Sequence, residues 1–322
     1  MCHWLAGNVQ VLGMFALIQS ILTKNINLLK ISSRDDGVFA TLLRAFENTS
    51  FTTPGGYTIK GDDLLKTIAV IYFNHADKTL GKIMSESANV RIAWGGKEAI
   101  ETVSNFSSRI DCEDIIFGPK LSFSVIARDK LMEPRLVKKL ARKVAVDVSV
   151  FDQTGCASPH NLYIETGGKI SPQDFAALLA EGLKKTALQI PKGYVSPEQI
   201  AAIHSARGVY DFKGKVWESE DSTWTILYSD ETTLNPPIYS RVINIHPIEN
   251  IEDTLIFIDN DIQTIGLAAS GPRALQYAEK AVSKGVMRFP EIGKMLNFES
   301  PWDGMFVMDR LVRWSTLGGP IV

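Results

Sequence analysis

Short apolar runs of strand length alternate with segments of helical periodicity along most of the chain. Strand-like runs lie at 26–31, 68–73 and 90–94, and in each of the segments that follow them apolar residues recur every three or four positions. This alternation is typical of a parallel sheet whose strands are joined by crossover helices. We therefore expect an α/β protein with a mostly parallel sheet.

The alternation begins again after Gly118 and Pro119. Further strand-like stretches lie at 121–127, 161–165, 216–230, 242–245 and 264–269, and helical ones at 134–146, 251–258 and 274–282. Two more helices are predicted where Ser-Pro pairs, at 171–172 and 196–197, offer an N-cap followed by proline at the first helical position. We predict two domains, residues 1–122 and residues 123–322, with 299–322 a C-terminal tail that packs back.

The composition limits the possible partners. With 322 residues, of which 45% are hydrophobic, the chain is long enough for a substantial core. The 34 basic and 36 acidic residues nearly balance, so neither nucleic acid nor an anionic membrane surface is an expected partner. Three scattered cysteines are too few for a disulfide framework or a zinc cluster, so we expect no metal site and a cytoplasmic location.

The most apolar segment lies at 5–22. It has no basic start, and Asn8, Gln10 and Gln19 interrupt it. It is therefore predicted to be a buried helix and not a targeting peptide. No stretch is long and apolar enough to be expected to span a membrane.

A ten-residue segment at 151–160, Phe-Asp-Gln-Thr-Gly-Cys-Ala-Ser-Pro-His, carries the clearest chemical signal. It places Cys156 in a turn-prone loop of small residues just before a strand, where a thiol can be reached and backbone N–H groups can favour its thiolate. For a lone cysteine, an inert position in a turn is the more frequent case. The context of Cys156 decides between the two.

The loop at 151–160 resembles the nucleophile segment of the aldehyde dehydrogenase superfamily, in which a glutamine-containing turn precedes the catalytic cysteine. Segments at 3–8, 25–32, 92–98 and 250–269 resemble further segments of this superfamily in the same order. Trp-Gly-Gly-Lys at 94–97, Phe-Gly-Pro-Lys at 117–120, Gly-Cys-Ala-Ser-Pro-His at 155–160 and Leu-Val-Arg-Trp at 311–314 are most similar to LuxC-like fatty-acyl-CoA reductases. The resemblance covers essentially the whole chain.

This resemblance implies an aldehyde-dehydrogenase-like fold, with a Rossmann-type NADP-binding domain at 1–122 and a catalytic cysteine domain at 123–322. In the superfamily the asparagine segment lies well inside the chain, whereas here it begins at residue 3. The chain is therefore expected to be truncated at its N-terminus, with an incomplete cofactor domain.

The resemblance also implies roles for individual residues. Cys156 would form a covalent acyl-enzyme, and the side-chain amide of Asn8 would hold the oxyanion together with the backbone N–H of Cys156. In hydrolytic relatives a glutamate activates the water that releases the acid, but Ile116 occupies the matching position here. Because isoleucine cannot act as a general base, thioester reduction is favoured over aldehyde oxidation.

The cofactor is predicted to be NADPH. A strand, Gly95, Gly96 and a helix follow one another in the order that lets backbone N–H groups approach a diphosphate, although a plain strand-to-helix turn has the same pattern. Lys30 matches the family's ribose-binding lysine. The positions after Lys30 hold the hydroxyls of Ser32 and Ser33 and the cation of Arg34. NAD-specific relatives often have a carboxylate here, whereas these side chains would bind a 2′-phosphate.

The expected reaction is NADPH-dependent reduction of a long-chain acyl-CoA or acyl-protein thioester to the aldehyde. The resemblance implies acyl-protein synthetase and transferase subunits as partners, and a homo-oligomer for a full-length protein. Two alternatives stay open, an aldehyde dehydrogenase that oxidises aldehydes and a non-catalytic remnant that binds acyl groups or cofactor.

Several other residues have a possible role and a more ordinary alternative. His160 could protonate a leaving group, but a buried structural ring is the more frequent case at a strand start. Basic residues of the helix at 134–146 could meet phosphates or a carrier protein, with a solvated helix face as the default: Lys138, Lys139, Arg142 and Lys143. Cys2 and Cys112 have no match in the family and no predicted role.

Overall fold

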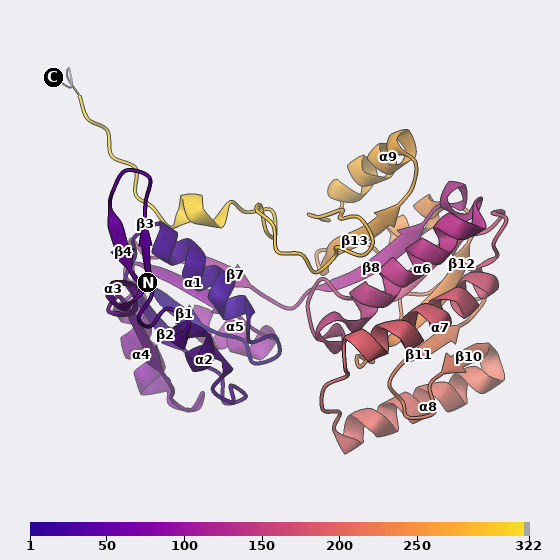
Figure 1. Ribbon diagram of the computed structural model, residues 1–322, viewed down its shortest axis with the longest axis horizontal. Helices are drawn as coiled ribbons and strands as arrows, with labels where there is room; N and C mark the ends of the chain where they lie inside the picture. The colour runs from indigo at the N-terminus through magenta and orange to yellow at the C-terminus, as the bar shows by residue number, and fades with distance from the viewer. Residues whose placement is uncertain (319–322) are drawn as a thin grey trace. The chain divides into compact units, whose positions relative to one another are not determined.

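The computed structural model describes residues 1–318, which form two compact units (Figure 1). Unit 1 combines residues 1–119 with the C-terminal segment that starts at Phe298, and unit 2 comprises residues 120–297. No described helix combines the length and the low polarity that a membrane span requires.

Unit 1 is built on a five-stranded parallel sheet with the order β5-β2-β1-β6-β7. Cys2 of the central strand β1 lies opposite Leu28 of β2 on one side and Arg91 of β6 on the other. The strands are β1 (Cys2–Trp4), β2 (Asn27–Lys30), β5 (Ile68–Ile71), β6 (Val90–Trp94) and β7 (Glu113–Phe117). The helices are α1 (Leu12–Leu22), α2 (Val38–Arg44), α4 (Lys78–Glu86) and α5 (Lys97–Ser104).

The predicted helix at 5–22 is wrong in its first half. β1 ends at Trp4, the N–H of Leu5 still bonds to Lys30 across the sheet, and α1 begins only at Leu12. The inward face of α1 presents the small residues Gly13, Ala16 and Ser20 together with Leu17. A Cβ on Gly13 would stand 2.8 Å from Leu5, so close packing selects small side chains here.

A small hairpin in unit 1 has no counterpart among the sequence predictions. Strands β3 (Ser50–Thr52) and β4 (Thr58–Lys60) pair antiparallel, and the short helix α3 (Gly61–Leu65) follows. The side chains of both strands are exposed, including the cross-strand pair Phe51 and Ile59. The strands are too short and too exposed to show the apolar runs by which the other strands were predicted.

Unit 2 contains a six-stranded sheet with the order β10-β11-β12-β9-β8-β13, in which only the edge strand β10 runs antiparallel. Its strands are β8 (Leu121–Ile126), β9 (Pro159–Glu165), β10 (Lys215–Glu218), β11 (Thr225–Tyr228), β12 (Val242–Ile248) and β13 (Ile262–Ala268). The α-helices are α6 (Pro134–Ser149), α7 (Pro172–Gln189), α8 (Pro197–Lys213) and α9 (Gly271–Val282). The predicted helix at 251–258 is a 3₁₀ helix, η3 (Ile251–Phe257).

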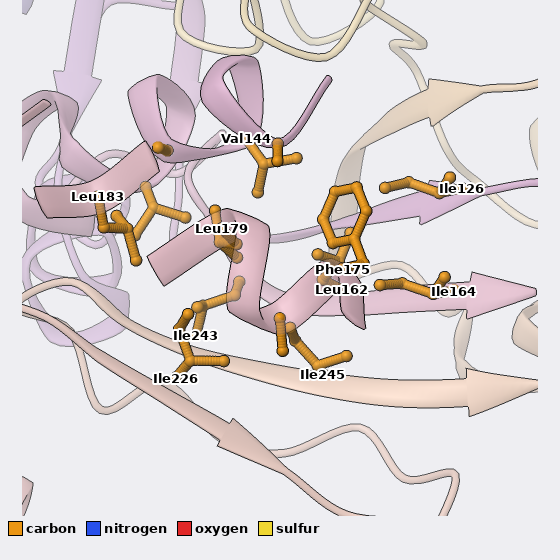
Figure 2. Packing of buried hydrophobic residues seen from close by; sticks show 14 of the residues in the cluster. Ile126, Val144, Leu162, Ile164, Phe175, Leu179, Leu183, Ile226, Ile243 and Ile245 are labelled. Atoms are coloured by element: carbon orange, nitrogen blue, oxygen red, sulfur yellow. The ribbon is translucent and has the colours of Figure 1, made fainter. Parts of the chain in front are cut away.

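The main core of unit 2 lies between α6, α7 and one face of this sheet. Figure 2 shows Phe175 of α7 close to Leu162 of β9, and these two side chains, Leu179 of α7 and Ile164 of β9 are all fully buried in one cluster. Burial of each such side chain contributes about 1.5–3 kcal/mol. The alternate strand residues, such as Phe123 and Tyr163, pack with α9 on the opposite face. Strands buried on both faces explain the continuous apolar runs of the sequence.

The C-terminal segment belongs to unit 1. Phe298 stacks on Phe15 with ring centroids 4.4 Å apart, and Trp302 stacks on Phe298 at 4.9 Å. Farther along, the Nε of Arg310 donates to Glu113 at 2.6 Å. The sequence placed the domain boundary at 122 and counted 299–322 with the second domain. In the structure the boundary falls after Pro119, and these contacts group the described part of the segment with unit 1.

Candidate functional site

A cleft of about 520 Å³ lies in unit 1 where four parallel strands end. Residues 5–8 follow β1, residues 32–34 follow β2, residues 72–75 follow β5, and Gly95 and Gly96 follow β6. Parallel strands bring their carboxyl ends to one edge of the sheet, which is where ligands of such folds bind. Asn8 lines this cleft. So does every residue predicted to bind the cofactor, namely Lys30, Ser32, Ser33, Arg34, Gly95 and Gly96.

The loops that follow β1 and β2 are packed directly against each other. A Cβ on Gly7 would clash with Ser32 Oγ and approach the Cβ of Arg34 to 3.1 Å, so a larger residue at this position would displace the second loop. The side-chain amide of Gln10 donates to the carbonyl of Arg34 at 2.9 Å. These contacts fix the loop of Asn8 and the loop of Ser32–Arg34 relative to each other.

Lys30 ends β2 at the base of the cleft. Its side chain is half-buried, and this burial lowers the pKa of the ammonium from its ordinary value. The Nζ atom lies 5.4 Å from the centroid of the Phe73 ring, which favours a cation electrostatically. A partly desolvated ammonium of this kind binds an anion or a hydroxyl group more strongly than a fully exposed one.

Gly95 and Gly96 join β6 to α5. Gly95 donates its N–H to Phe117 O at 3.2 Å, and Gly96 is the N-cap of α5, with no side-chain cap. A Cβ on Gly96 would meet no atom within 4 Å, so its backbone faces open space. The N-terminus of α5 at this cleft favours a negatively charged ligand through its N–H groups and helix dipole.

A smaller, mainly apolar cavity of about 200 Å³ adjoins the cleft, and the two share Leu5, Lys30, Phe73, His75, Trp94 and Ala99. Ile100 and Val103 of α5 line it, together with Phe106 beyond the helix. The indole of Trp94 stacks on Phe117 with ring centroids 3.8 Å apart, which gives this wall a fixed position. The sequence prediction missed the residues after β5, such as His75, although their position after a strand was a usable signal.

The predicted nucleophile lies in unit 2. After α6 the chain forms the short 3₁₀ helix η2 (Val150–Gln153), in which residues 151–153 have left-handed backbone conformations, and it enters β9 at Pro159. Cys156 is half-buried in the turn between, where Ser158 donates its N–H to Gly155 O at 3.0 Å. The Oγ of Ser122 donates to the carbonyl of Cys156 at 2.8 Å. The loop thus joins the amino ends of β8 and β9.

Gln153 ties this loop to two strands. Its Nε2 donates to Pro159 O at 2.8 Å and to Val242 O at 3.0 Å, at the amino ends of β9 and β12. The side chain is fully buried. Gln153, which the family resemblance pointed to, therefore anchors the loop to β9 and β12.

His160 is buried at the start of β9. Its ring meets Tyr239 edge to face with centroids 5.2 Å apart, and burial lowers its pKa to about 4. The imidazole is therefore neutral at neutral pH and cannot serve as a cationic acid. This state fits the structural role better than the alternative of a proton donor.

The remaining candidates neither line the cleft nor belong to the turn at 154–158. On α6, Lys138 pairs with Glu181 of α7 at 3.0 Å, and Lys143 pairs with Glu291. Both lysines are exposed, as the default of a solvated face predicts. Ile116 occupies β7 with a half-buried side chain. Within residues 1–318 no group of three or more His, Cys, Asp or Glu side chains is arranged to hold a metal ion.

Comparison with known proteins identifies the family. Residues 1–314 match the family described as acyl-CoA reductase (LuxC). The chain belongs to the LuxC family. The long-chain acyl-protein thioester reductase of Vibrio harveyi is 30% identical over 319 residues, which cover 97% of this chain and 62% of that protein. The chain thus spans about three fifths of the length of the curated relatives it matches.

Solved structures show the fold of this LuxC family member. The indole-3-acetaldehyde dehydrogenase AldA of P. syringae, solved with NAD⁺ and IAA, superposes with a TM-score of 0.68 at 12% identity over 96% of this chain and 66% of that one. The propionaldehyde dehydrogenase of Rhodopseudomonas palustris, solved with propionyl-CoA, gives 0.60 at 12% identity over 92% and 65%. The predicted aldehyde-dehydrogenase-like fold is confirmed.

Proposed function

We propose that this chain is the cofactor-binding and catalytic part of an NADPH-dependent reductase that converts a long-chain acyl thioester into the aldehyde through an acyl group on Cys156. The observation that carries the proposal is the cleft of unit 1. Residues predicted from three separate segments of the sequence line that one cleft. Membership of the LuxC family and the name of the V. harveyi relative support the reaction.

The cleft and its adjoining cavity fit an adenine dinucleotide in size and polarity. The N–H groups of Gly96 and of the first turn of α5 would face the diphosphate, and the apolar cavity would take the adenine ring. Lys30 would bind the ribose, and Arg34 with its two neighbouring serines would bind the 2′-phosphate. No acidic side chain lines the cleft among the described residues, whereas Asp77 and Glu98 line the adjoining cavity, so the 2′-phosphate is placed in the cleft. When bound, NADPH would supply the hydride that reduces the acyl carbon.

The protein's own chemistry begins at Cys156. Its sulfur attacks the carbonyl carbon of the acyl donor, a new C–S bond forms, and the donor's C–S bond breaks. The departing thiolate takes up the proton that the cysteine thiol has lost, so that the charge balances. Asn8 and the backbone N–H of Cys156 would donate to the oxyanion, and loss of one such donor typically lowers the rate about 10²–10³-fold.

Ile116 favours reduction over hydrolysis. In this proposal the matching position holds no carboxylate, so no side chain there activates a water molecule against the acyl-enzyme. The acyl group therefore persists on sulfur long enough to be reduced.

We propose that either an acyl-CoA or an acyl-protein thioester is the acyl donor. The family is described as acyl-CoA reductase, whereas the V. harveyi relative is named for an acyl-protein thioester. Acyl-protein synthetase and transferase subunits are the proposed partners, and a full-length protein is proposed to assemble as a homo-oligomer in the cytoplasm.

Intact-mass spectrometry tests the central step. The chain is incubated with a long-chain acyl-CoA, and a mass increase of one acyl group is expected on the wild type and not on Cys156→Ser. With NADPH present, the adduct should disappear as NADPH is consumed and aldehyde forms. Free acid as the product would instead support an aldehyde-oxidising enzyme. A chain that binds NADPH but never carries an acyl group from any donor would contradict the proposal.

A further inference from the structure

Two stretches of left-handed backbone meet beside the loop that carries Cys156. The φ angles are 54°, 48° and 64° for residues 151–153 and 62°, 57° and 63° for residues 239–241. None of these six residues is glycine, and other residues rarely adopt this region because the Cβ atom comes too close to a backbone oxygen. Such conformations persist only where their surroundings hold them, and they gather at functional sites.

Asp152 joins the two stretches. Its Oδ1 accepts the Nε–H of Arg241 at 2.5 Å, and its backbone carbonyl accepts the N–H of Ser240 at 3.0 Å. Its Oδ2 accepts the N–H of Gly193 at 2.8 Å. A single residue of the nucleophile loop is thus bonded to two other loops of unit 2.

Arg241 is the buried half of this ion pair. Its side chain is 1% exposed, and Nη1 donates to Ile190 O at 2.9 Å. The Nζ of Lys192 lies close by and donates to Ser222 O at 2.7 Å and to Ser240 O at 3.0 Å. A buried guanidinium needs a counter-charge, because loss of one partner leaves an uncompensated charge in the interior. The interior therefore holds Asp152 in place.

The position of Asp152 is transmitted to Cys156 over a short distance along the chain. The next residue, Gln153, is fixed by its bonds to Pro159 and Val242, so the turn at 154–158 is anchored at both ends. Within the turn, Ser122 holds the carbonyl of Cys156. A shift of Asp152 would move the first anchor, and the turn with it.

We propose that Asp152 and Arg241 are positioning residues that hold the turn at 154–158 in the orientation in which the Sγ of Cys156 can take an acyl group. The inference rests on the proposed function, because it assumes that Cys156 is acylated. Neither residue contacts the acyl donor in this scheme. Both act through the backbone of the loop, across 89 positions of sequence.

Asp152→Asn tests the pair because it removes the charge and keeps the size of the side chain. We expect acylation of Cys156 by a long-chain acyl-CoA to slow about 100-fold, since a displacement of about 1 Å near the reacting atoms costs that much. Alkylation of the same thiol by iodoacetamide, a small reagent without a fixed orientation, should change little. Arg241→Gln should slow acylation similarly, and the double variant should be no slower than either single one.

Arg273→Gln is the matched control. Arg273 pairs with the buried Glu165 elsewhere in unit 2, so its loss should lower the melting temperature and leave the ratio of acylation to alkylation unchanged. The inference is overturned if Asp152→Asn is acylated at the wild-type rate. It is equally overturned if both rates fall together in Asp152→Asn, or if Arg273→Gln reproduces the effect, because each result indicates a general loss of folding.

A second measurement separates this inference from the proposed function. If the wild-type chain accepts no acyl group from any donor, the proposed function fails. Hydrogen–deuterium exchange still tests whether Asp152 holds the turn at 154–158, because it does not depend on acylation. The amides of residues 151–158 should exchange faster in Asp152→Asn than in the wild type, and at the wild-type rate in Arg273→Gln. Unchanged exchange in Asp152→Asn would contradict the inference.

Discussion

Burial shifts the pKa values of individual side chains in unit 2, downwards for a histidine and upwards for a carboxyl group. Desolvation lowers the pKa of His160 to about 4 and raises that of Asp147 to about 7, although Asp147 accepts a backbone N–H at 3.1 Å. Glu165 is desolvated too, but hydrogen bonds from Arg273 and Arg128 outweigh this effect and bring its pKa to about 2. A buried carboxyl group therefore keeps its charge down to low pH where a counter-charge is in contact.

At the scale of one residue, we predict that His160→Gln weakens the loss of stability in mild acid. The folded pKa of about 4 lies below the ordinary 6.5, so the neutral ring stabilises the fold above pH 6.5, and this contribution is lost as the pH falls towards 4. The gap corresponds to roughly 3 kcal/mol. Urea unfolding at several values between pH 7 and pH 4 should show a shallower decline in the variant.

His204→Gln, which replaces an exposed histidine of α8, is the control for this experiment. It should decline with pH as the wild type does. Parallel curves for the wild type and His160→Gln would mean that the ring is not kept neutral by the fold.

The strand–turn–helix unit of β6 and α5 shows how one element combines structure with a binding surface. β6 is buried along its whole length, whereas the turn behind it opens onto the cleft. Within the turn the two glycines differ. A Cβ on Gly95 would lie 3.0 Å from the Cβ of Ala99, but a Cβ on Gly96 would meet nothing within 4 Å. Gly95 is thus closely packed against α5, whereas the backbone of Gly96 is open to a ligand.

At this scale, we predict that Gly96→Ala keeps the melting temperature of the wild type and weakens NADPH binding at least about tenfold, or about 1.4 kcal/mol. The added methyl group has room in the protein but would occupy space that the proposed diphosphate needs. Isothermal titration calorimetry gives the Kd. Gly118→Ala, at another glycine with open space that does not line the cleft, should change neither quantity. An unaltered Kd for Gly96→Ala would argue against a diphosphate at this turn.

Over the whole molecule, unit 1 is closed by a segment that comes from the far end of the chain. The aromatic stack of Phe298 and Trp302 on Phe15, and the bonds of Arg310 to Glu113 and Asp114, join this segment to residues far away in the sequence. Unit 2 is instead one continuous stretch of chain. The two units therefore depend differently on the C-terminal segment.

At the scale of the whole molecule, we predict that removal of residues 298–322 destabilises unit 1 by at least about 3 kcal/mol, the usual cost of losing one buried aromatic side chain, and leaves unit 2 unchanged. Hydrogen–deuterium exchange resolved by peptide measures each unit. Removal of residues 315–322 alone serves as the control and should alter neither unit, since residues 315–318 are exposed. Equal loss of protection in both units would contradict the assignment of the segment to unit 1.

Much of the secondary structure could be predicted because apolar periodicity and capping residues within each segment indicate it. β6 occupies the predicted residues 90–94, and Ser171 and Ser196 cap α7 and α8 as their Ser-Pro pairs indicated. Strands that are buried on both faces have unbroken apolar runs in their sequence. An N-cap is recognisable because its side chain bonds to a backbone N–H within three residues of it. The predicted cofactor residues and Asn8 line the cleft, because they belong to recognisable segments at the ends of β1, β2 and β6, whereas the cleft residues after β5 were not predicted.

The sequence alone determined the α/β class, the family and the candidate residues, because short-range periodicity and local motifs encode them. Only the tertiary structure decided that small residues form the inner face of α1, that Phe298 joins unit 1, and that Asp152 is held by Arg241. Each of these depends on packing or pairing between segments far apart in the chain. No local pattern specifies such a partner, because it is set by which surfaces the fold brings together.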